Sequence, residues 1–467
     1  MEMSRRSFVF GSGAALSVAC LAACSGGADG AAESQEINVT GSQKAYLQPD
    51  DWGVNVSRTI LELDHAIEPA SVDADSFVIT EEKDAFVDFE TFEIGRVTTE
   101  RTVVDAYTSD EAGNKVDEAS SFVTVCMGIS PAEGGATIYS MEDFATHWED
   151  PYTLTVALAE GASPSSPDGA VTALEVGGDL DVSGQNKVCP AEDGWDFTPT
   201  FTSSDGIEFH YAFYTPGDAA ADKLVIWLHG GGECGTDPQI AVVGGAEVTA
   251  LSGENFQATL GDAYVLVPQA PAGTNWCTGS EGDMNGTVQM YGANPSIYLD
   301  SLFELIEDFV TSTPSIDPAK VLIGGCSAGG YMTVAELIAH PGYFAAGFPI
   351  SEAYYSQYLS DDEIAELAKT PTWFTNAKND SIQPDLASED VVARLRAIDA
   401  DLHHSEFDDV HDTSGRFMAS SENPFALDPD GDVPYQYNGH WSWIYFLNDE
   451  CEEGGLSAWD WLADQVK

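Results

Sequence analysis

The chain has 467 residues, of which 78 are Asp or Glu and only 17 are Lys or Arg, so its formal net charge is −61 at pH 7. This length is sufficient for two or three domains. The scarcity of basic side chains argues against nucleic acid or an anionic membrane surface as a binding partner, because both are bound through Lys and Arg. The acidity instead favours a soluble protein that works outside the cell or in salt.

Residues 1–23 are predicted to be an export signal. Residues 4–9, Ser-Arg-Arg-Ser-Phe-Val, form a twin-arginine pattern, and the apolar segment 9–23 is too short to span a membrane as a helix. Residues 21–24, Leu-Ala-Ala-Cys, resemble a bacterial lipobox, whose cysteine becomes the lipid-modified first residue of the mature protein. We therefore expect export by the twin-arginine route and a lipid anchor at Cys24 that holds the chain on the extracytoplasmic face of the cell membrane.

Three regions are expected between the signal and the last domain. Residues 24–36 are small and polar and predict a flexible, lipid-anchored tether. Residues 37–160 contain short alternating segments separated by turn residues, which is typical of a β-sandwich. Residues 161–195 are rich in Gly, Ser, Pro and Asp and predict a linker. The sandwich strands are expected at 54–63, 76–79, 92–101, 121–127 and 152–158.

Residues 196–467 show a different pattern, in which short apolar segments alternate with longer amphipathic ones. This alternation predicts an α/β domain with a mostly parallel sheet covered by helices on both sides. In such a sheet the ligand site lies at the carboxyl ends of the strands. Strands are expected at 224–228, 263–268, 321–323, 345–350, 372–376 and 402–407, and helices at 297–310, 328–339 and 388–400.

The candidate nucleophile is Ser327. The segment 321–330, Val-Leu-Ile-Gly-Gly-Cys-Ser-Ala-Gly-Gly, predicts a strand that turns sharply into a helix. Glycines two residues before and after the serine allow a strained turn that lifts the hydroxyl out of the sheet. This pattern also occurs by chance, so a catalytic role requires a base, an acid and an oxyanion site elsewhere in the chain.

A glycine-rich loop supplies the candidate oxyanion site. Residues 229–233, His-Gly-Gly-Gly-Glu, follow a predicted strand directly, and without side chains their backbone N–H groups can approach a developing oxyanion. We expect the donors to be the N–H groups of Gly231, Gly232 and Ala328. His229 opens this loop ahead of the serine, which favours a role in holding the loop over a role as base.

The candidate acid and base follow the serine, in the chain order serine, acid, histidine. Asp380 lies just after the predicted strand 372–376, and its nearest rival is Asp385. His440 follows Gly439 and precedes an aromatic segment, which makes it the favoured base. The alternatives are His403 and His404 on a predicted strand, and His411 in an acidic loop that would keep it protonated.

Four segments together resemble the prolyl-oligopeptidase-like and polyhydroxybutyrate-depolymerase-like esterases of the α/β-hydrolase superfamily. The resemblance covers about residues 190–467 and implies a Ser327–His440–Asp380 triad that forms an acyl-enzyme without a cofactor or metal. Residues 60–67 followed by 74–78 look like the immunoglobulin-like domain that precedes some secreted bacterial esterases. The four segments are 228–233, 325–330, 377–380 and 439–443.

The substrate is narrowed less than the mechanism. In the family that the chain resembles, the dipeptidyl and oligopeptidyl peptidases carry a large β-propeller before the hydrolase, whereas only ~150 residues of sandwich-like sequence precede it in this chain. Between Ser327 and Asp380 only residues 352–370 could form a cap, so an open site is expected, which suits bulky or polymer-borne esters such as acyl or aryl esters of polysaccharide. The expected partner is thus a small-molecule or polymer-borne ester. The alternatives are a prolyl-oligopeptidase-like serine peptidase and a non-enzymatic surface lipoprotein with an inactive hydrolase domain.

Other residues have weaker assignments. Trp276 and Tyr291 are candidates for lining the acyl or aryl pocket, although aromatic loop residues often only pack. Residues 428–432, Asp-Pro-Asp-Gly-Asp, alternate carboxylates as calcium loops do, but they lack the downstream Glu, which favours a bare acidic turn. Cys326 is expected to be a buried thiol. At least one of the other five cysteines after Cys24 should then stay free.

Overall fold

The computed structural model describes residues 35–88, 93–184, 186–217, 220–279, 295–382 and 387–466. The predicted export signal, the lipobox cysteine Cys24, the pocket candidate Tyr291 and the rival acid Asp385 lie outside the described residues. Within the described ranges, no helix is both long enough and apolar enough to span a membrane.

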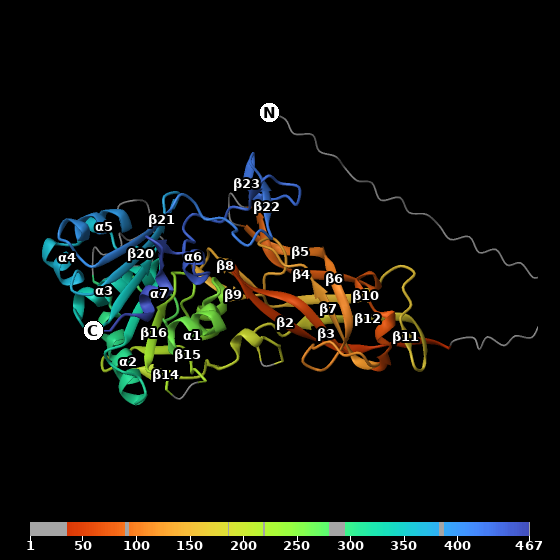
Figure 1. The fold of residues 1–467 in the computed structure, drawn as a ribbon. Coiled ribbons are helices and arrows are strands. Elements are labelled where there is room, and N and C mark those ends of the chain that lie inside the picture. Colours follow the sequence, from red (N-terminus) through yellow and green to blue (C-terminus); the bar gives the residue numbers. More distant parts are fainter. Residues whose placement is uncertain are drawn as a thin grey trace, which may run out of the picture. The chain divides into compact units, whose positions relative to one another are not determined.

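The first part of the described chain is a sandwich of two β-sheets (Figure 1). One sheet has the antiparallel order β2-β3-β7-β6. Its strands are β2 (Gly41–Asp50), β3 (Gly53–Ile67), β6 (Val103–Ser109) and β7 (Ser120–Met127). The other has the order β1-β12-β10-β4-β5, with β11 paired to β12. Its strands are β1 (Glu36–Val39), β4 (Phe77–Asp88), β5 (Glu93–Arg101), β10 (Tyr152–Leu158), β11 (Ser165–Ser166) and β12 (Gly169–Leu180).

The five strands expected in the sandwich are confirmed as β3, β4, β5, β7 and β10. The prediction of a linker over residues 161–195 was wrong, because β12 lies in this stretch and pairs along β10, with Val176 opposite Val156. The buried residues of β12 are separated by exposed Gly, Glu and Asp residues, which dilute the alternating apolar signal. The sequence analysis also missed the hairpin of β8 (Thr137–Ser140) and β9 (Ala145–Trp148).

A buried ion pair between β4 and β5 of one sheet also binds the other sheet through its arginine. The Arg101 guanidinium bonds the Glu81 carboxylate at 2.6 Å, and it also donates to the carbonyl oxygens of Val56 and Gly128 at 3.1 and 2.7 Å. The Tyr152 hydroxyl donates to the same Glu81 carboxylate. A buried ion pair is tolerated when further hydrogen bonds satisfy its remaining polar atoms, as they do here.

The second part contains a nine-stranded sheet of order β13-β15-β17-β16-β18-β19-β20-β21, with β14 paired to β15. The run from β17 to β21 is parallel, and β13, β14 and β15 are antiparallel additions at one edge. The strands are β13 (Trp195–Asp196), β14 (Thr200–Thr202), β15 (Glu208–Tyr214), β16 (Lys223–Leu228), β17 (Ala263–Gln269), β18 (Val321–Cys326), β19 (Ala346–Ile350), β20 (Thr372–Ala377) and β21 (Leu402–Phe407).

Helices cover both faces of this sheet, which confirms the predicted fold class. On β16, Leu224 and Ile226 belong to a core with one set of helices, whereas Val225 and Trp227 belong to a core with the other set. This division follows from the strand, since successive side chains point to opposite faces. The first set is α2 (Leu299–Ser312), α3 (Ala328–Ala339), α4 (Asp361–Leu367) and α5 (Ser388–Ala397). The second is α1 (Glu254–Leu260), α6 (Trp443–Leu447) and α7 (Ala458–Ala463).

Short elements complete the described chain. They are the helical turns η1 (Pro69–Ser71), η2 (Ala74–Ser76), η3 (Pro190–Glu192), η4 (Ile240–Gly244), η5 (Val248–Ser252) and η6 (Ser356–Tyr358), and the strands β22 (Met418–Ser420), β23 (Asn423–Leu427), β24 (Val433–Pro434), β25 (Glu452–Glu453) and β26 (Leu456–Ser457). The 428–432 segment is the turn between β23 and β24, and Asp432 there accepts from the Ser421 backbone N–H at 2.8 Å.

The sandwich and the α/β part pack against each other as one compact unit from Glu36 onward. The β8–β9 hairpin makes part of this contact: the Thr137 hydroxyl donates to the carbonyl oxygen of Gly244 at 3.0 Å, and the Trp148 indole donates to Asp237 at 2.8 Å. Both acceptors lie after β16, in the stretch that contains the glycine-rich loop. The sandwich therefore contacts the part of the α/β domain that carries the candidate oxyanion site.

Candidate active site

Ser327 occupies the sharp turn between β18 and α3. Its backbone has φ 53° and ψ −114°, a conformation that is strained for a residue with a side chain. The Ser327 backbone N–H donates to the carbonyl oxygen of Ile350 at 2.9 Å, which ties the turn to the end of β19. Strain held in place by neighbouring strands is the geometry expected of a nucleophile elbow.

The glycines around Ser327 are required by close backbone packing. A Cβ atom on Gly325 or Gly329 would overlap the carbonyl oxygen of Leu228, the last residue of β16. A Cβ atom on Gly330 would lie 2.8 Å from the Cα atom of Glu352. The elbow therefore sits directly on the ends of β16 and β19, in a space that side chains at these positions would fill.

Asp380 and His440 form a buried hydrogen-bonded pair. The Nδ1 atom of His440 lies 2.7 Å from Oδ2 of Asp380, and the two residues are 5% and 7% exposed. With Nδ1–H donated to the carboxylate, Nε2 is left as the acceptor that a general base needs. The other carboxylate oxygen of Asp380 accepts from the Ile382 backbone N–H at 2.8 Å, which fixes the orientation of the acid.

A hydrogen bond links the histidine loop, residues 438–442, to the end of β19, the strand beside the elbow. Ser442, two residues after His440, shares a hydrogen bond of 2.7 Å with the hydroxyl of Ser351. Ser351 directly follows Ile350, the residue whose carbonyl oxygen binds the Ser327 N–H. The histidine loop and the serine elbow thus meet at the same carboxyl edge of the sheet, as parallel strands require.

The other candidate histidines are engaged elsewhere. His411 pairs with Asp409 at 2.6 Å, His403 pairs with Glu453 at 2.8 Å, and Nε2 of His404 lies 2.6 Å from Oδ1 of Asn376. None of these contacts involves Asp380.

His229 is neutral and holds the glycine-rich loop through both of its ring nitrogens. The backbone N–H of Ala270 donates to its Nε2 at 3.0 Å, so Nδ1 carries the proton and donates to the carbonyl oxygen of Gly230 at 2.6 Å. Burial lowers the pKa of His229 to about 4. Both ring nitrogens are therefore used to shape the loop, as its place in the sequence suggested.

The sandwich also binds this loop, through a contact that sequence reasoning missed. The backbone N–H of Thr146, on β9, donates to the carbonyl oxygen of Gly232 at 2.7 Å. From the other side, the Gln269 side chain donates to the carbonyl oxygen of Glu233 at 2.8 Å. No motif near Thr146 could have indicated this contact, because it joins backbone groups 86 positions apart in the sequence.

The three expected oxyanion donors remain available in this arrangement. The backbone N–H groups of Gly231, Gly232 and Ala328 donate to no other described residue. Ala328 is the first residue of α3, where backbone N–H groups lack partners within the helix. The helix dipole adds positive potential at the same point.

Trp276 does not line a pocket, contrary to the prediction. Its side chain is fully buried and packs against the rings of Phe209, His229 and Tyr298 at 6.2, 5.2 and 6.3 Å. Burial of this apolar ring is favourable, so the indole lies in the core. Its contact with His229 supports the first residue of the glycine-rich loop. All six described cysteines are free, and Cys326 is buried behind the elbow, where burial raises its pKa.

Two regions of the chain match known families. Residues 44–163 match the family described as the esterase Ig-like N-terminal domain, and residues 290–401 match the prolyl oligopeptidase family. These matches, together with the fold, confirm the resemblance expected from the sequence: an esterase-type immunoglobulin-like domain followed by an α/β-hydrolase domain. No curated protein matches the chain.

One solved structure shares the fold over most of the chain, and others match parts of it. One described as a thermostable esterase has a TM-score of 0.68 and 19% identity, and the match covers 92% of this chain and all of that one. A ferulic acid esterase has a TM-score of 0.34 and 14% identity over 47% of this chain and 90% of its own. A Pyrococcus horikoshii acylaminoacyl peptidase has a TM-score of 0.33 and 15% identity over 45% and 36%. The similarity to the thermostable esterase shows a common fold, whereas the other two similarities are too low to do so.

Glu352 is a buried carboxyl group beneath the elbow. It follows β19 and is fully buried; one of its oxygens accepts from the Tyr354 backbone N–H at 2.5 Å, and the other has no hydrogen-bond partner among the described residues. Burial raises the pKa of Glu352 to about 8. The side chain is therefore protonated at neutral pH.

We expect Glu352→Gln to remove part of the pH dependence of stability. Between the unfolded pKa of about 4.5 and the folded pKa of about 8, the folded state keeps a proton that the unfolded chain releases. The parent protein therefore loses stability as pH rises through this window, by at most ~1.4 kcal/mol per pH unit from this group. Urea unfolding at pH 5, 6, 7 and 8 should show a flatter profile for the variant. Glu175→Gln, at an exposed position of β12, is the control, and an equal change in both variants would contradict the prediction.

Proposed function

We propose that this protein is a serine hydrolase that cleaves carboxylic esters through an acyl-enzyme. The observation that carries the proposal is the buried His440–Asp380 pair, which lies at the same edge of the sheet as the strained Ser327 elbow. A histidine whose Nδ1 is bound by a carboxylate, at the same sheet edge as an elbow serine and a glycine-rich loop, supplies each role that acyl transfer needs.

The proposed reaction has two halves. His440 Nε2 takes the proton of the Ser327 hydroxyl while the oxygen attacks the ester carbonyl carbon. The carbonyl electron pair moves to its oxygen, which the N–H groups of Gly231, Gly232 and Ala328 stabilise. The C–O bond to the alcohol then breaks, and the alcohol leaves with the proton from His440. In the second half, His440 takes a proton from water, which attacks the acyl-enzyme and releases the carboxylic acid and the free serine.

Esters on a polymer are the proposed substrates. Between Ser351 and Thr370, part of the stretch that separates the elbow from Asp380, the described chain forms only η6 and the seven-residue α4, which is little material for a cap. A site that this stretch leaves open suits bulky acyl or aryl esters, including those carried by polysaccharide. The second candidate is a serine peptidase, which the match to the prolyl oligopeptidase family favours. A sandwich stands where that family's peptidases carry a propeller, which favours the ester.

The site of action is proposed from the first residues of the chain. The twin-arginine pattern and the lipobox around Cys24 support export and lipid anchoring at the outer side of the cell membrane. The formal net charge of −61 suits a protein exposed to the medium. Anchoring would keep the enzyme at the cell surface, where polymeric esters are met before uptake.

A fluorophosphonate probe should label the purified protein and fail to label Ser327→Ala. The probe reacts with a serine hydroxyl only when a base activates it, so labelling reports the nucleophile and the base together. Ser42→Ala is the matched control, since Ser42 is an exposed serine on β2 of the sandwich, outside the site, and this variant should be labelled. An unlabelled parent protein would favour the non-enzymatic alternative.

The ester preference can be measured on a panel of substrates. We expect turnover of aryl esters and of feruloyl or acetyl sugars, with kcat/KM for matched aminoacyl amides at least about a hundredfold lower, because the amine of an amide is a poorer leaving group than the alcohol of an ester. Steady-state rates on each class decide the matter. Faster cleavage of amides would establish the peptidase alternative, and turnover confined to small aryl esters would contradict the polymer substrate.

Metabolic labelling with a tritiated fatty acid tests the anchor. The full chain expressed in a bacterial host should incorporate label and sediment with membranes. Cys24→Ala should incorporate none and appear in the soluble exported fraction, whereas Cys20→Ala should behave like the parent. Equal labelling of the parent and Cys24→Ala would refute the anchor at this position.

A further inference from the structure

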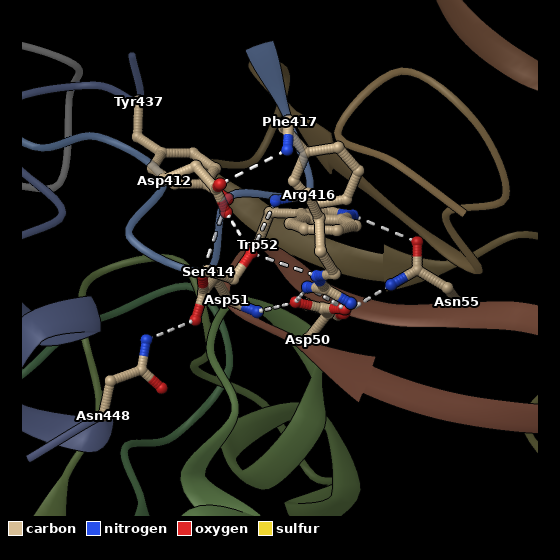
Figure 2. Close-up of polar contacts among 11 residues, drawn as sticks. Asp50, Asp51, Trp52, Asn55, Asp412, Ser414, Arg416, Phe417, Tyr437 and Asn448 are labelled. Atoms are coloured by element: carbon tan, nitrogen blue, oxygen red, sulfur yellow. Dashed lines mark hydrogen bonds and ion pairs between the residues drawn. The ribbon is translucent and has the colours of Figure 1, made fainter. Parts of the chain in front are cut away.

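The turn between β2 and β3 of the sandwich contacts two residues that flank His440 in the sequence, Tyr437 before it and Asn448 after it (Figure 2). Oδ1 of Asp51 accepts from the Asn448 side-chain amide at 2.9 Å, and Oδ2 accepts from the Tyr437 hydroxyl at 3.4 Å. Tyr437 lies three residues before His440. The helix α6 begins three residues after His440, and Asn448 directly follows this helix. One carboxylate of the sandwich therefore holds the segment on either side of the candidate base.

Aromatic rings connect the same turn to His440. Trp52 stacks on Tyr437 with ring centres 6.5 Å apart, and Tyr437 in turn packs on Trp441 at 6.3 Å. Trp441 packs on Trp443 at 6.3 Å, and the Trp443 ring meets His440 edge-on at 5.5 Å. The rings form a continuous packed path from the sandwich to the imidazole, and packed interiors transmit displacement because they compress little.

A second set of contacts holds the β2–β3 turn against the segment that precedes β22 (Figure 2). The Nη2 atom of Arg416 donates to both carboxylate oxygens of Asp50, at 2.6 and 2.8 Å, and hydrogen bonds between two charged groups are stronger than those between neutral ones. Asp50 is 4% exposed, and Trp52 contacts the Phe417 ring edge-on at 5.2 Å. Arg416 and Phe417 precede β22, in the excursion that leads from β21 to His440.

The carboxylates here act as hydrogen-bond acceptors. Asp50, Asp51 and Glu247 place oxygens within 4.8 Å of one another. Both oxygens of Asp50 are bound by Arg416, and those of Asp51 by Tyr437 and Asn448, so these two carboxylates already have partners. Burial raises the pKa of Asp51 to about 6 and that of Glu247 to about 8, which limits the net negative charge of the group.

We propose that Asp51 and Trp52 of the sandwich, acting through Tyr437 and Asn448, are positioning residues that set the place of His440 relative to Ser327. The proposal rests on the proposed function of His440 as base. The stretch 438–442 contains no helix or strand. Besides the contacts above, the Tyr437 backbone N–H donates to the carbonyl oxygen of Val410 at 2.8 Å, and the Tyr437 ring packs on Tyr435 at 5.3 Å. A base displaced by about 1 Å can lose up to a hundredfold in rate, so such supports matter for turnover more than for binding.

Three variants of the full chain test the proposal on a short aryl ester. Asp51→Ala removes both acceptors and should lower kcat about tenfold with KM within about twofold, because the base moves while the ester-binding groups stay in place. Tyr437→Phe removes one contact and should lower kcat about threefold. Asp51→Asn still offers an oxygen to Asn448 and an amide to Tyr437, and it should recover kcat to within about threefold of the parent.

The matched control is Tyr152→Phe, which removes a buried tyrosine hydroxyl from the sandwich core far from the histidine loop in sequence. It should lower the unfolding midpoint and leave kcat within about twofold of the parent. Hydrogen exchange at residues 437–448 provides a readout without turnover, and it should be faster in Asp51→Ala and unchanged in Tyr152→Phe.

Several results would overturn the positioning role. These are an unchanged kcat in folded Asp51→Ala, a fall of KM and kcat together that leaves their ratio unaltered, or an equal loss of kcat in Tyr152→Phe. A parent protein that neither labels with fluorophosphonate nor hydrolyses any ester would instead refute the proposed function. Even in that case, unchanged hydrogen exchange at residues 437–448 in Asp51→Ala would refute the support of this segment by Asp51. The failure of the positioning proposal and the failure of the proposed function are therefore distinguishable.

Discussion

The rest of the site depends on the close approach of backbone at the carbonyl oxygen of Leu228. This atom ends β16, and the absence of Cβ atoms at Gly325 and Gly329 lets the elbow lie directly against it. The next residue, His229, begins the glycine-rich loop. One steric contact therefore brings the strained serine and the N–H groups of the candidate oxyanion site to the same point, and no flexible side chain takes part in it.

Around this contact, the protein controls which polar groups are charged. His229 is neutral because it is buried and both of its ring nitrogens are committed to backbone groups. Burial also raises the pKa of Glu233 to about 7 and that of Glu352 to about 8. At neutral pH Glu352 is therefore protonated and Glu233 about half protonated, which lowers the negative charge beside the elbow in a chain with a large excess of acidic residues.

The sandwich belongs physically to the site. Its β9 strand binds the carbonyl oxygen of Gly232, and its β2–β3 turn binds the residues on either side of His440. These two contacts meet the two irregular segments of the site, whereas the elbow and Asp380 follow strands of the central sheet directly. Loops that carry function need support from elsewhere, and here a second domain provides it.

The sequence by itself determined the strands and helices around the elbow, the order of the motifs and the pairing of Asp380 with His440. These features are local: apolar periodicity fixes the strands, and glycines mark the turns that only they can adopt. It did not determine that β12 completes the sandwich, that Trp276 is core, or that Thr146 and Asp51 support the site. Those depend on contacts between residues far apart in the chain, and only the tertiary structure decides them, because hydrogen bonds to backbone groups and ring packing leave no motif in either partner.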